Sequence, residues 1–375
     1  METLVDVVLL SFLVVIAIAI VRTKDLLAVV MLTGIYGLLS ASFFVVLDAV
    51  DVAFTEASVG AGISGLLMLA AISMTGRTES PKRHKPLLAL FVVLITGGML
   101  IYGTMDMPYF GSFDAPIHQH VAPRYINDSM QEVGVPNIVT SVLASYRAFD
   151  TLGEVAVIFT AGIGVLSLLA LPQRRKSYRL DEPKKEQMYQ QHIVLRVISK
   201  ALIPFILLFA LYVQFHGDFG PGGGFQAGVI FAAAIILYAM LFGLDNAKRV
   251  FSLSLFQLLA AIGLLLYASV GVVSLFNGGN FLDYNVLADD PIAGQHLGIL
   301  LIELGVGCTV ASVMIIIFFN FAGRREAQQH STKQNCHELI SPELNRNVLN
   351  STELNSTELN SAELSITVLN NGEVK

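Results

Sequence analysis

Hydrophobic residues in this chain of 375 residues fall into long runs that are separated by shorter polar segments. A membrane-spanning helix needs about 20 predominantly apolar residues, and the runs have about that length. They cover residues 4–21, 26–47, 52–74, 86–103, 152–171, 193–215, 224–243, 250–276 and 296–321. Apolar runs of this kind cross a bilayer as helices, because a helix satisfies its own backbone hydrogen bonds. The pattern therefore predicts an all-α, polytopic membrane protein with about nine transmembrane helices.

Composition agrees with this pattern and narrows the class of protein. Only 14% of the residues are charged, whereas soluble domains carry about 25%. Met1, Glu2 and Thr3 precede the first apolar run without a basic region, so we expect a retained span and not a cleaved signal peptide. The two cysteines, Cys308 and Cys336, have neither disulfide nor metal-ligand spacing. We expect no metal site, no cofactor and no nucleic-acid partner.

Basic residues indicate how the helices are oriented. All but two of the 23 Lys and Arg residues follow the odd-numbered spans or lie in the C-terminal tail, and the two exceptions are Arg124 and Arg147. Because cytoplasmic loops carry the excess of Lys and Arg, we expect the N-terminus outside and the C-terminus in the cytoplasm. The long segment 104–151 is then external. It contains His118 and His120, which we interpret as part of a solvated loop, since no second ligand pair with zinc spacing accompanies them.

Shifts in composition divide the chain into an apolar part at 1–172, a charged linker at 173–192 that we expect in the cytoplasm, a second apolar part at 193–323 and a tail at 324–375. The last is rich in Asn, Ser, Thr and Glu, with a leucine at every fifth position from Leu339 to Leu369. Stacked repeats need neighbours to bury a core, and these units are few, so we expect a mostly disordered tail without a role in transport.

Ionisable residues within the predicted spans are candidates for an ion or proton path. Such a side chain costs at least about 2.5–3.5 kcal/mol to insert, so its presence favours a function. Glu56, Glu154 and Glu303 meet this criterion, and His296 lies two helical turns before Glu303 on the same face. A buried carboxyl group can exchange a proton against a bound cation, because burial favours its neutral form and a nearby cation its charged form. The alternative for Glu303 is packing against a neighbouring helix, and for His296 a simple hydrogen bond at the interface.

A second candidate group surrounds Glu154. Arg147, Asp150 and Glu154 are three and seven residues apart, so they share one stripe if the segment is helical. The arginine could then tune either carboxylate. A structural clamp between loop and helix is the alternative.

The most unusual stretch is the glycine-rich turn at residues 216–228, between the sixth and seventh apolar runs. It combines turn-forming residues with polar side chains: His216, Asp218, Pro221, Gly222, Gly223, Gly224 and Gln226. Gly and Pro disfavour helix by about 1 and 3 kcal/mol. A tight interhelical turn accounts for the glycines and the proline, but the polar side chains favour a functional role.

Three strings carry a resemblance to known families. His216–Gly228, together with His296-Leu-Gly-Ile-Leu-Leu-Ile-Glu303, resembles MnhB, the B component of Mrp-type multisubunit Na+/H+ antiporters. Ala53-Phe-Thr-Glu-Ala-Ser-Val-Gly-Ala-Gly62 is similar to the MbhD-type domain at the C-terminal end of the antiporter's large A component, and Tyr146-Arg-Ala-Phe-Asp-Thr-Leu-Gly-Glu154 to the MbhE-type domain after it. The resemblance implies an MbhD-like domain at 1–78, an MbhE-like domain at 79–172 and an MnhB-like domain at 193–323. The antiporter-like domain of about fourteen spans that characterises this large component is absent from the sequence. The resemblance therefore implies a fused protein that works only with other membrane subunits.

From the resemblance we expect a transporter subunit, not an enzyme, in the cytoplasmic membrane of a prokaryote. Its complex would exchange internal Na+ for external H+, with Glu56 and Glu154 in the ion or proton path. The MnhB-like part would mainly build and seal the interface. Two alternatives remain open at this point. The chain could belong to the membrane arm of a redox-driven ion pump such as an energy-converting hydrogenase, or it could be a purely structural scaffold.

Overall fold

The computed structural model describes residues 2–79, 86–109, 111–169 and 193–350. Within these residues it contains nine helices that are long and apolar enough to cross a membrane. They cover Thr3–Arg22, Leu26–Val46, Val50–Ile72, Leu87–Thr104, Ala148–Leu169, Arg196–His216, Gly224–Phe242, Leu253–Phe276 and Pro291–Arg324. The predicted polytopic all-α fold is thus confirmed. The predicted linker at 173–192 lies outside the described residues.

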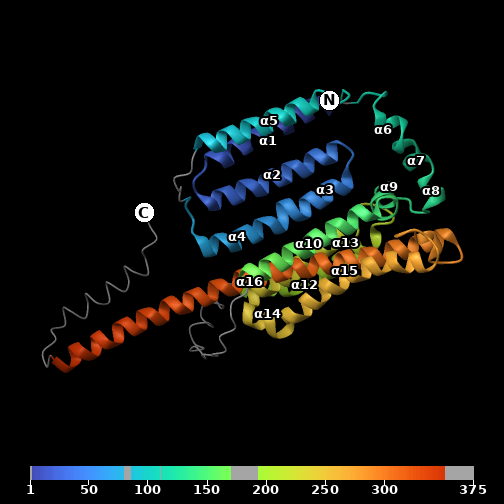
Figure 1. Cartoon of the computed structure of the whole chain (residues 1–375). Helices are drawn as coiled ribbons and strands as arrows, with labels where there is room; N and C mark the ends of the chain where they lie inside the picture. The colour runs from blue at the N-terminus through green and yellow to red at the C-terminus, as the bar shows by residue number, and fades with distance from the viewer. Residues whose placement is uncertain (1, 80–85, 110, 170–192, 351–375) are drawn as a thin grey trace. The chain divides into compact units, whose positions relative to one another are not determined.

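Eleven elements build these spans (Figure 1). They are α1 (Glu2–Arg22), α2 (Leu26–Val46), α3 (Val50–Glu56), η1 (Ala57–Ile63), α4 (Ser64–Thr75), α5 (Pro86–Thr104), α10 (Ala148–Leu169), α12 (Ile193–His216), α13 (Gly224–Phe242), α15 (Leu253–Phe276) and α16 (Pro291–Asn350). A short helix, α14 (Leu244–Val250), links α13 to α15, and the 3-10 turn η3 (Tyr284–Val286) lies between α15 and α16. In the N-terminal segment, α2 packs against α1, α3, η1 and α4, and α13 contacts α3 and η1.

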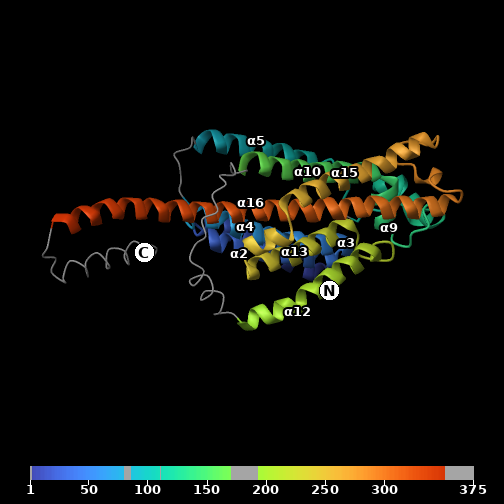
Figure 2. The same ribbon diagram turned by 90° about the horizontal axis from the view of Figure 1, so that it is seen from below.

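Helix α16 is the central helix of the C-terminal part (Figures 1 and 2). Glycines bring its neighbours close to it: a Cβ atom on Gly162 of α10 would lie 3.1 Å from Val313, and one on Gly228 of α13 would lie 2.8 Å from the Gly307 carbonyl oxygen. A Cβ on Gly305 would lie 2.7 Å from the carbonyl oxygen of Gly263 in α15. Small residues allow this approach of backbones in lipid.

The third span differs from a regular α-helix, because its middle section η1 is a π-helix. A second π-helix, η2 (Ser141–Tyr146), precedes α10. η1 begins directly after Glu56 and overlaps the string Ala53–Gly62, and η2 ends at Tyr146, the first residue of the string Tyr146–Glu154. Short π-helical turns occur frequently at functional sites.

The segment before α10 is more ordered than the predicted solvated loop. It forms α6 (Pro116–Gln119), α7 (Val121–Asn127), α8 (Ser129–Glu132) and α9 (Ile138–Thr140), followed by η2. His118 and His120 are exposed, in agreement with the loop interpretation. However, Val133 and Val135 are 1% exposed and belong to the main hydrophobic core. Their burial, together with the polar contacts described below, folds this part of the segment onto the helices.

The beginning of the predicted disordered tail is also different. Residues 325–350 continue α16 as one helix and belong to a second compact unit, Arg325–Lys375, whereas Met1–Arg324 form the first. Extending an existing helix needs no new nucleus, and this stretch contains Ala, Gln, Glu, Arg and Leu, which favour helix. Residues 351–375 lie outside the described part of the chain.

Candidate functional site

The glycine-rich turn joins the end of α12 to the start of α13. Gly223 has a φ of +117°, and its N–H donates a hydrogen bond to the Val213 carbonyl oxygen at 3.0 Å. A Cβ atom on Gly222 would lie 2.7 Å from that same oxygen. A positive φ and such close backbone contact both favour glycine. The turn is therefore built by residues that let the chain fold back on α12.

The turn encloses the carboxylate of Glu303. A Cβ atom on Gly217 would lie 3.3 Å from Glu303 Oε2, and one on Gly223 would lie 3.1 Å from Oε1. The first turn of α13 thus begins beside this carboxylate, and a helix N-terminus offers free N–H groups and a partial positive charge. Within the described part of the chain, the Glu303 carboxylate forms no hydrogen bond or ion pair with another side chain. Its neighbours are the backbone of the turn.

Polar side chains from the segment before α10 hold the outer side of the turn. Asn137 Nδ2 donates to the carbonyl oxygens of Gly217 at 3.2 Å and Gly220 at 3.1 Å. Thr140 Oγ1 donates to the Gly217 carbonyl at 2.6 Å. The Asn137 N–H also donates to the Asp218 carbonyl at 3.0 Å. The sequence interpretation missed Asn137 and Thr140, because nothing local marks a contact across about 80 residues of chain.

The remaining polar residues of the turn connect it to three different helices. Gln226 is 7% exposed, and its Nε2 donates to Thr55 Oγ1 of α3 at 2.8 Å. Asp218 Oδ2 lies 3.6 Å from His296 Nδ1 of α16. His216 stacks on Tyr212 one turn earlier in α12, with 4.9 Å between ring centroids. Pro221 is exposed. His296 and Glu303 therefore meet the same turn from one face of α16.

Beside the turn lies a cavity of about 620 Å³, and its lining residues come from segments that are far apart in the sequence. Its polar lining comes from side chains near the start of the third span, from α9 and α10, and from α13 and α16. These residues are Asp51, Thr55, Thr140, Thr151, Glu154, Gln226 and Glu303. The cavity thus brings Glu154 and Glu303 to one space, although 149 positions separate them in the sequence. Glu154 is exposed at the chain surface and, within the described residues, has no side-chain partner.

Other candidates lie apart from this cavity. Glu56 is the last residue of α3, and its Oε1 lies so close to Gly60 that a Cβ atom at that position would collide with it. Arg147 ends η2 and is not part of α10, and its Nε donates to Asp150 Oδ2 at 2.7 Å. The side chains of this pair are 59% and 51% exposed. The predicted stripe of Arg147, Asp150 and Glu154 required one helix through all three residues, and Arg147 lies outside α10. Arg147 still binds Asp150, whereas Glu154 lines the cavity.

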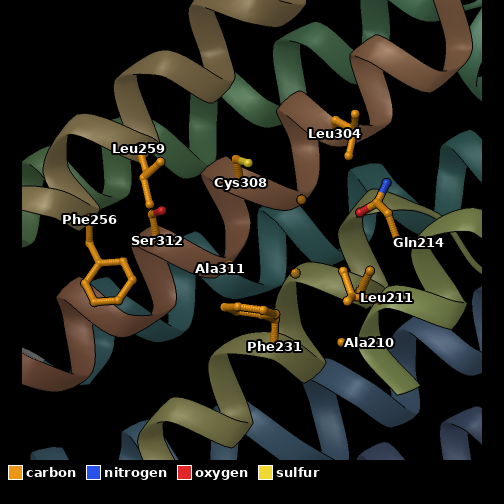
Figure 3. A pocket seen from close by; sticks show the side chains of 13 residues that line it. Ala210, Leu211, Gln214, Phe231, Phe256, Leu259, Leu304, Cys308, Ala311 and Ser312 are labelled. Atoms are coloured by element: carbon orange, nitrogen blue, oxygen red, sulfur yellow. The ribbon is translucent and has the colours of Figure 1, made fainter. Parts of the chain in front are cut away.

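A second cavity, of about 220 Å³, lies between α12, α13, α15 and α16 (Figure 3). Its walls are mainly apolar, and Phe231, Phe256 and Leu259 are among them. The labelled polar side chains at its edge are Gln214, Cys308 and Ser312. It contains no ionisable carboxyl or amino group, so it is not suited to bind an ion.

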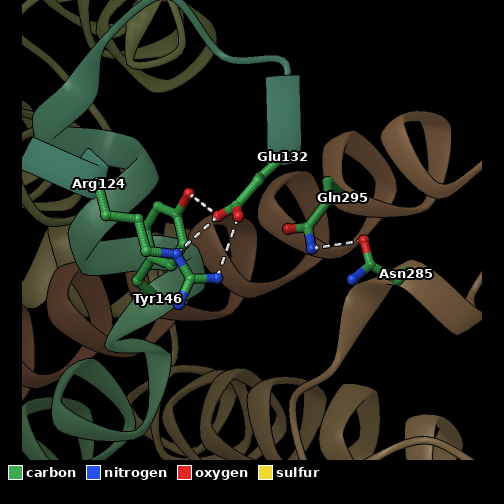
Figure 4. Close-up of polar contacts among 5 residues, drawn as sticks. All are labelled: Arg124, Glu132, Tyr146, Asn285 and Gln295. Atoms are coloured by element: carbon green, nitrogen blue, oxygen red, sulfur yellow. Dashed lines mark hydrogen bonds and ion pairs between the residues drawn. The ribbon is translucent and has the colours of Figure 1, made fainter. Parts of the chain in front are cut away.

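A third cavity, of about 680 Å³, is polar and lies where the segment before α10 meets the connection between α15 and α16. Figure 4 shows two groups of side chains around it. Arg124 binds Glu132 through two hydrogen bonds, at 3.1 and 3.2 Å, and the Tyr146 hydroxyl donates a third to Glu132. Gln295 Nε2 donates to Asn285 Oδ1 at 3.0 Å.

Two groups in this polar cavity have shifted pKa values. The hydrogen bonds from Tyr146 and Arg124 lower the pKa of the Glu132 carboxyl below its usual value. Burial, and then the neighbouring Glu132, raises the pKa of the Tyr146 hydroxyl. Both shifts keep Glu132 ionised and Tyr146 protonated at neutral pH, which preserves the hydrogen bonds between them.

Family models match most of the chain. A model described as a domain related to the MnhB subunit of Na+/H+ antiporter matches residues 194–316. Models described as subunits D and E of MBH match residues 11–77 and 90–187. The large cavity is lined by residues from each of these three regions.

Individual relatives agree with the family models. A protein of Rhizobium meliloti, described as a probable A/B subunit of a K(+)/H(+) antiporter, is 28% identical over 341 residues, which are 81% of this chain and 33% of the relative. A putative antiporter subunit mnhB2 of Staphylococcus aureus is 33% identical over 141 residues, which are 37% of this chain and 99% of the relative. In the structure of the Mrp complex from Dietzia sp., one chain is 26% identical, with a TM-score of 0.67 over 84% of this chain and 34% of that chain. The chain thus spans about a third of the two longer proteins that it matches.

Proposed function

This chain belongs to the MnhB family of Na+/H+ antiporter subunits, and we propose that it is a membrane component of a multisubunit monovalent cation/proton antiporter complex. Its MbhD-like and MbhE-like regions precede the MnhB-like region in one polypeptide. The complex would lie in the cytoplasmic membrane of a prokaryote and contain other membrane subunits that complete the ion path. Na+ is the proposed cation, with K+ as the alternative because one relative is described as part of a K(+)/H(+) antiporter.

The single observation that carries this proposal is the cavity that contains Glu154 and Glu303. Two carboxylates without side-chain partners face one space within membrane-spanning helices. A charged side chain at this depth is costly, and its cost is justified by function more often than by packing. Hydroxyl and amide groups of Thr55, Thr151 and Gln226 complete the lining. Carboxylate, hydroxyl and amide oxygens are ligands suited to hard cations such as Na+.

Exchange at such a site follows from charge balance. A carboxylate in a medium of low dielectric constant is stabilised either by a proton or by a cation. A cation that enters the cavity therefore favours release of a proton, and a proton that returns favours release of the cation. In this proposal Glu154 takes part directly, and Glu303 is held in place by the glycine-rich turn and shares the same cavity.

The other sequence candidates receive supporting roles in the proposal. Glu56 ends α3 directly before η1, one residue after Thr55, which lines the cavity. It would connect the cavity to the N-terminal helices. Arg147 and Asp150 would clamp the junction between η2 and α10. Asp218 and His296 would fix the glycine-rich turn on α16.

Inverted membrane vesicles test this function. The gene is deleted with the rest of its operon intact, and the collapse of a respiration-generated ΔpH is followed after Na+ or K+ is added. We expect the cation-dependent collapse to disappear with the deletion and to return with the gene. Glu154→Gln and Glu303→Gln should lower the exchange rate by about a hundredfold, the low end of what a positioned proton-transfer group contributes. Glu79→Gln, in an exposed loop, is the matched control and should exchange normally.

Two results would contradict the proposal. Exchange that is unchanged by the deletion, together with loss of reductant-driven ion pumping, would assign the chain to a redox-driven pump. Normal exchange in assembled complexes with either Gln substitution would make that carboxylate a packing residue.

A further inference from the structure

Two tyrosines lie fully buried between the large cavity and the polar cavity. Tyr267 of α15 and Tyr284 of η3 are both 0% exposed and are among the largest fully buried side chains. Both lie in the MnhB-like region but outside the strings named in the sequence analysis, and neither has a role in the proposed function. Their hydroxyl groups are polar, whereas the core around them is apolar. Such groups are rare in a core unless they are bonded or functional.

The Tyr267 hydroxyl connects α15 to the beginning of α10. It donates a hydrogen bond of 2.7 Å to the Ala148 carbonyl oxygen. The hydroxyl groups of Thr151 and Tyr284 also lie close to it. Thr151 lines the large cavity and is three residues before Glu154 on α10, so these two side chains are neighbours on the helix surface. The Thr151 hydroxyl donates to the Leu143 carbonyl oxygen at 2.8 Å. Tyr267 and Thr151 thus place two neighbouring hydroxyl groups beside the cavity that Glu154 lines.

The Tyr284 hydroxyl is a third member of this group. Its oxygen is buried and forms no well-aligned hydrogen bond, although the Tyr267 hydroxyl is its neighbour. The ring is fixed, because it packs against Gly298 of α16, where any larger residue would collide with it. A hydroxyl group in a fixed ring without a well-aligned partner is costly for stability. The fold nevertheless keeps it beside Tyr267.

The polar cavity reaches the other side of the tyrosine pair. Ala148, which accepts the bond from Tyr267, lines this cavity, and so do Asp283 and Asn285, the two neighbours of Tyr284 in the chain. Figure 4 shows Asn285 beside Gln295 at this wall. With about 30 Å³ per molecule of liquid water, cavities of 680 and 620 Å³ are each large enough for many water molecules. The pair thus lies between two spaces that can contain water.

We propose that Tyr284, Tyr267 and Thr151 form a hydroxyl relay that carries protons between the polar cavity and Glu154. A proton that reaches the Tyr284 oxygen forms a new O–H bond, and the hydrogen already on that oxygen passes to Tyr267. Tyr267 turns its hydroxyl from the Ala148 carbonyl oxygen and passes its hydrogen to Thr151. Thr151 turns from the Leu143 carbonyl oxygen and passes its own, through water in the large cavity that both residues line, to the Glu154 carboxylate. Each hydroxyl ends with one hydrogen and no net charge. The relay rests on the proposed function, since it supplies the proton that Glu154 exchanges.

Tyr284→Phe is the decisive variant. It removes a hydroxyl that forms no well-aligned hydrogen bond and keeps the ring, so folding and assembly should be unaffected. Tyr267→Phe is the second variant. Tyr238→Phe is the matched control, because this ring of α13 packs on Phe242 and Phe251 away from both cavities. The initial rate of cation-dependent ΔpH collapse is measured in inverted vesicles and divided by the amount of assembled complex.

We expect Tyr284→Phe and Tyr267→Phe each to lower this rate by at least about tenfold, well within the contribution of a proton-transfer group, and Tyr238→Phe to leave it unchanged. The double variant should be no slower than the slower single variant, because one missing link interrupts the whole series. Independent packing effects would instead multiply.

Three results overturn the relay while the antiporter function stands. They are a normal rate per complex for Tyr284→Phe, a rate in the double variant that is the product of the two single effects, and an equal loss in Tyr238→Phe. The proposed function fails separately, when wild-type vesicles show no cation-dependent collapse beyond that of the deletion strain.

Discussion

Gly224→Ala tests whether the close contact between α13 and α16 holds the glycine-rich turn in place. A Cβ atom on Gly224 would collide with the Glu303 carbonyl oxygen and would lie 3.0 Å from the Gly307 nitrogen. Both are backbone atoms of a central helix, so neither can rotate away as the end of a side chain can. Overpacking of this kind costs about 1–3 kcal/mol. Alanine gains at most about 1 kcal/mol of helix propensity over glycine, so the expected net effect is a destabilisation of up to about 3 kcal/mol.

The assay is the thermal midpoint of the detergent-solubilised protein, followed by size-exclusion chromatography after heating. Gly164→Ala, in α10, is the control, because a Cβ atom at that position would have no neighbouring atom within 4 Å. We expect Gly224→Ala to lower the midpoint and Gly164→Ala to leave it unchanged or to raise it slightly. Equal midpoints for both variants would refute the contact between α13 and α16. A lower midpoint for Gly164→Ala alone would show that position 164 carries the packing instead.

Two further predictions concern the segment before α10. Asn137→Ala removes the amide that binds two carbonyl oxygens of the glycine-rich turn, and leaving such acceptors unbonded costs about 1–3 kcal/mol. Limited proteolysis should therefore cut residues 111–136 faster than in wild type. The control is Gln119→Ala, in the exposed end of α6, which should not change the rate of cutting. The hydrogen bonds from Tyr146 and Arg124 lower the pKa of Glu132 below 4.5, the pKa of a glutamate without these partners. These bonds therefore stabilise the segment fully above about pH 4.5. The stabilisation is lost as the pH falls through the lowered pKa. Because the side chain is 38% exposed, solvent limits the contribution to about 1 kcal/mol or less. Glu132→Gln should increase proteolysis at pH 7 but not at the acidic end of the titration, and an equal difference at both pH values would contradict this assignment.

The nine spans could be predicted from sequence because a bilayer imposes a simple requirement on length and polarity. Each predicted run corresponds to one of the long apolar helices in the described part of the chain. Boundaries shifted by a few residues where polar residues extend a helix beyond the apolar run, as at Ala148, where α10 begins four residues earlier than predicted. The π-helices could not be predicted in this way, since they add hydrogen-bond irregularity without changing hydropathy.

The candidate site was predicted only in part, because its geometry depends on contacts between distant segments. Glu154 and Glu303 were found through their charge within apolar runs, but their common cavity depends on how α10 packs near α16. Asn137 and Thr140 carry no charge and lie in a segment that reads as a loop. Tyr267 and Tyr284 have no sequence signal at all, since a tyrosine is common both at interfaces and in cores. Burial and orientation, which only the fold defines, separate them from the other tyrosines.

The large cavity has one further consequence, for synthesis of the complex. Its walls come from the MbhD-like, MbhE-like and MnhB-like regions. Because one polypeptide carries all three, translation fixes their stoichiometry, and each region meets the others at the high effective concentration of covalently linked partners. The regions that contribute Glu154 and Glu303 are therefore present together as soon as the chain is made. Formation of the cavity does not depend on the association of separately inserted proteins.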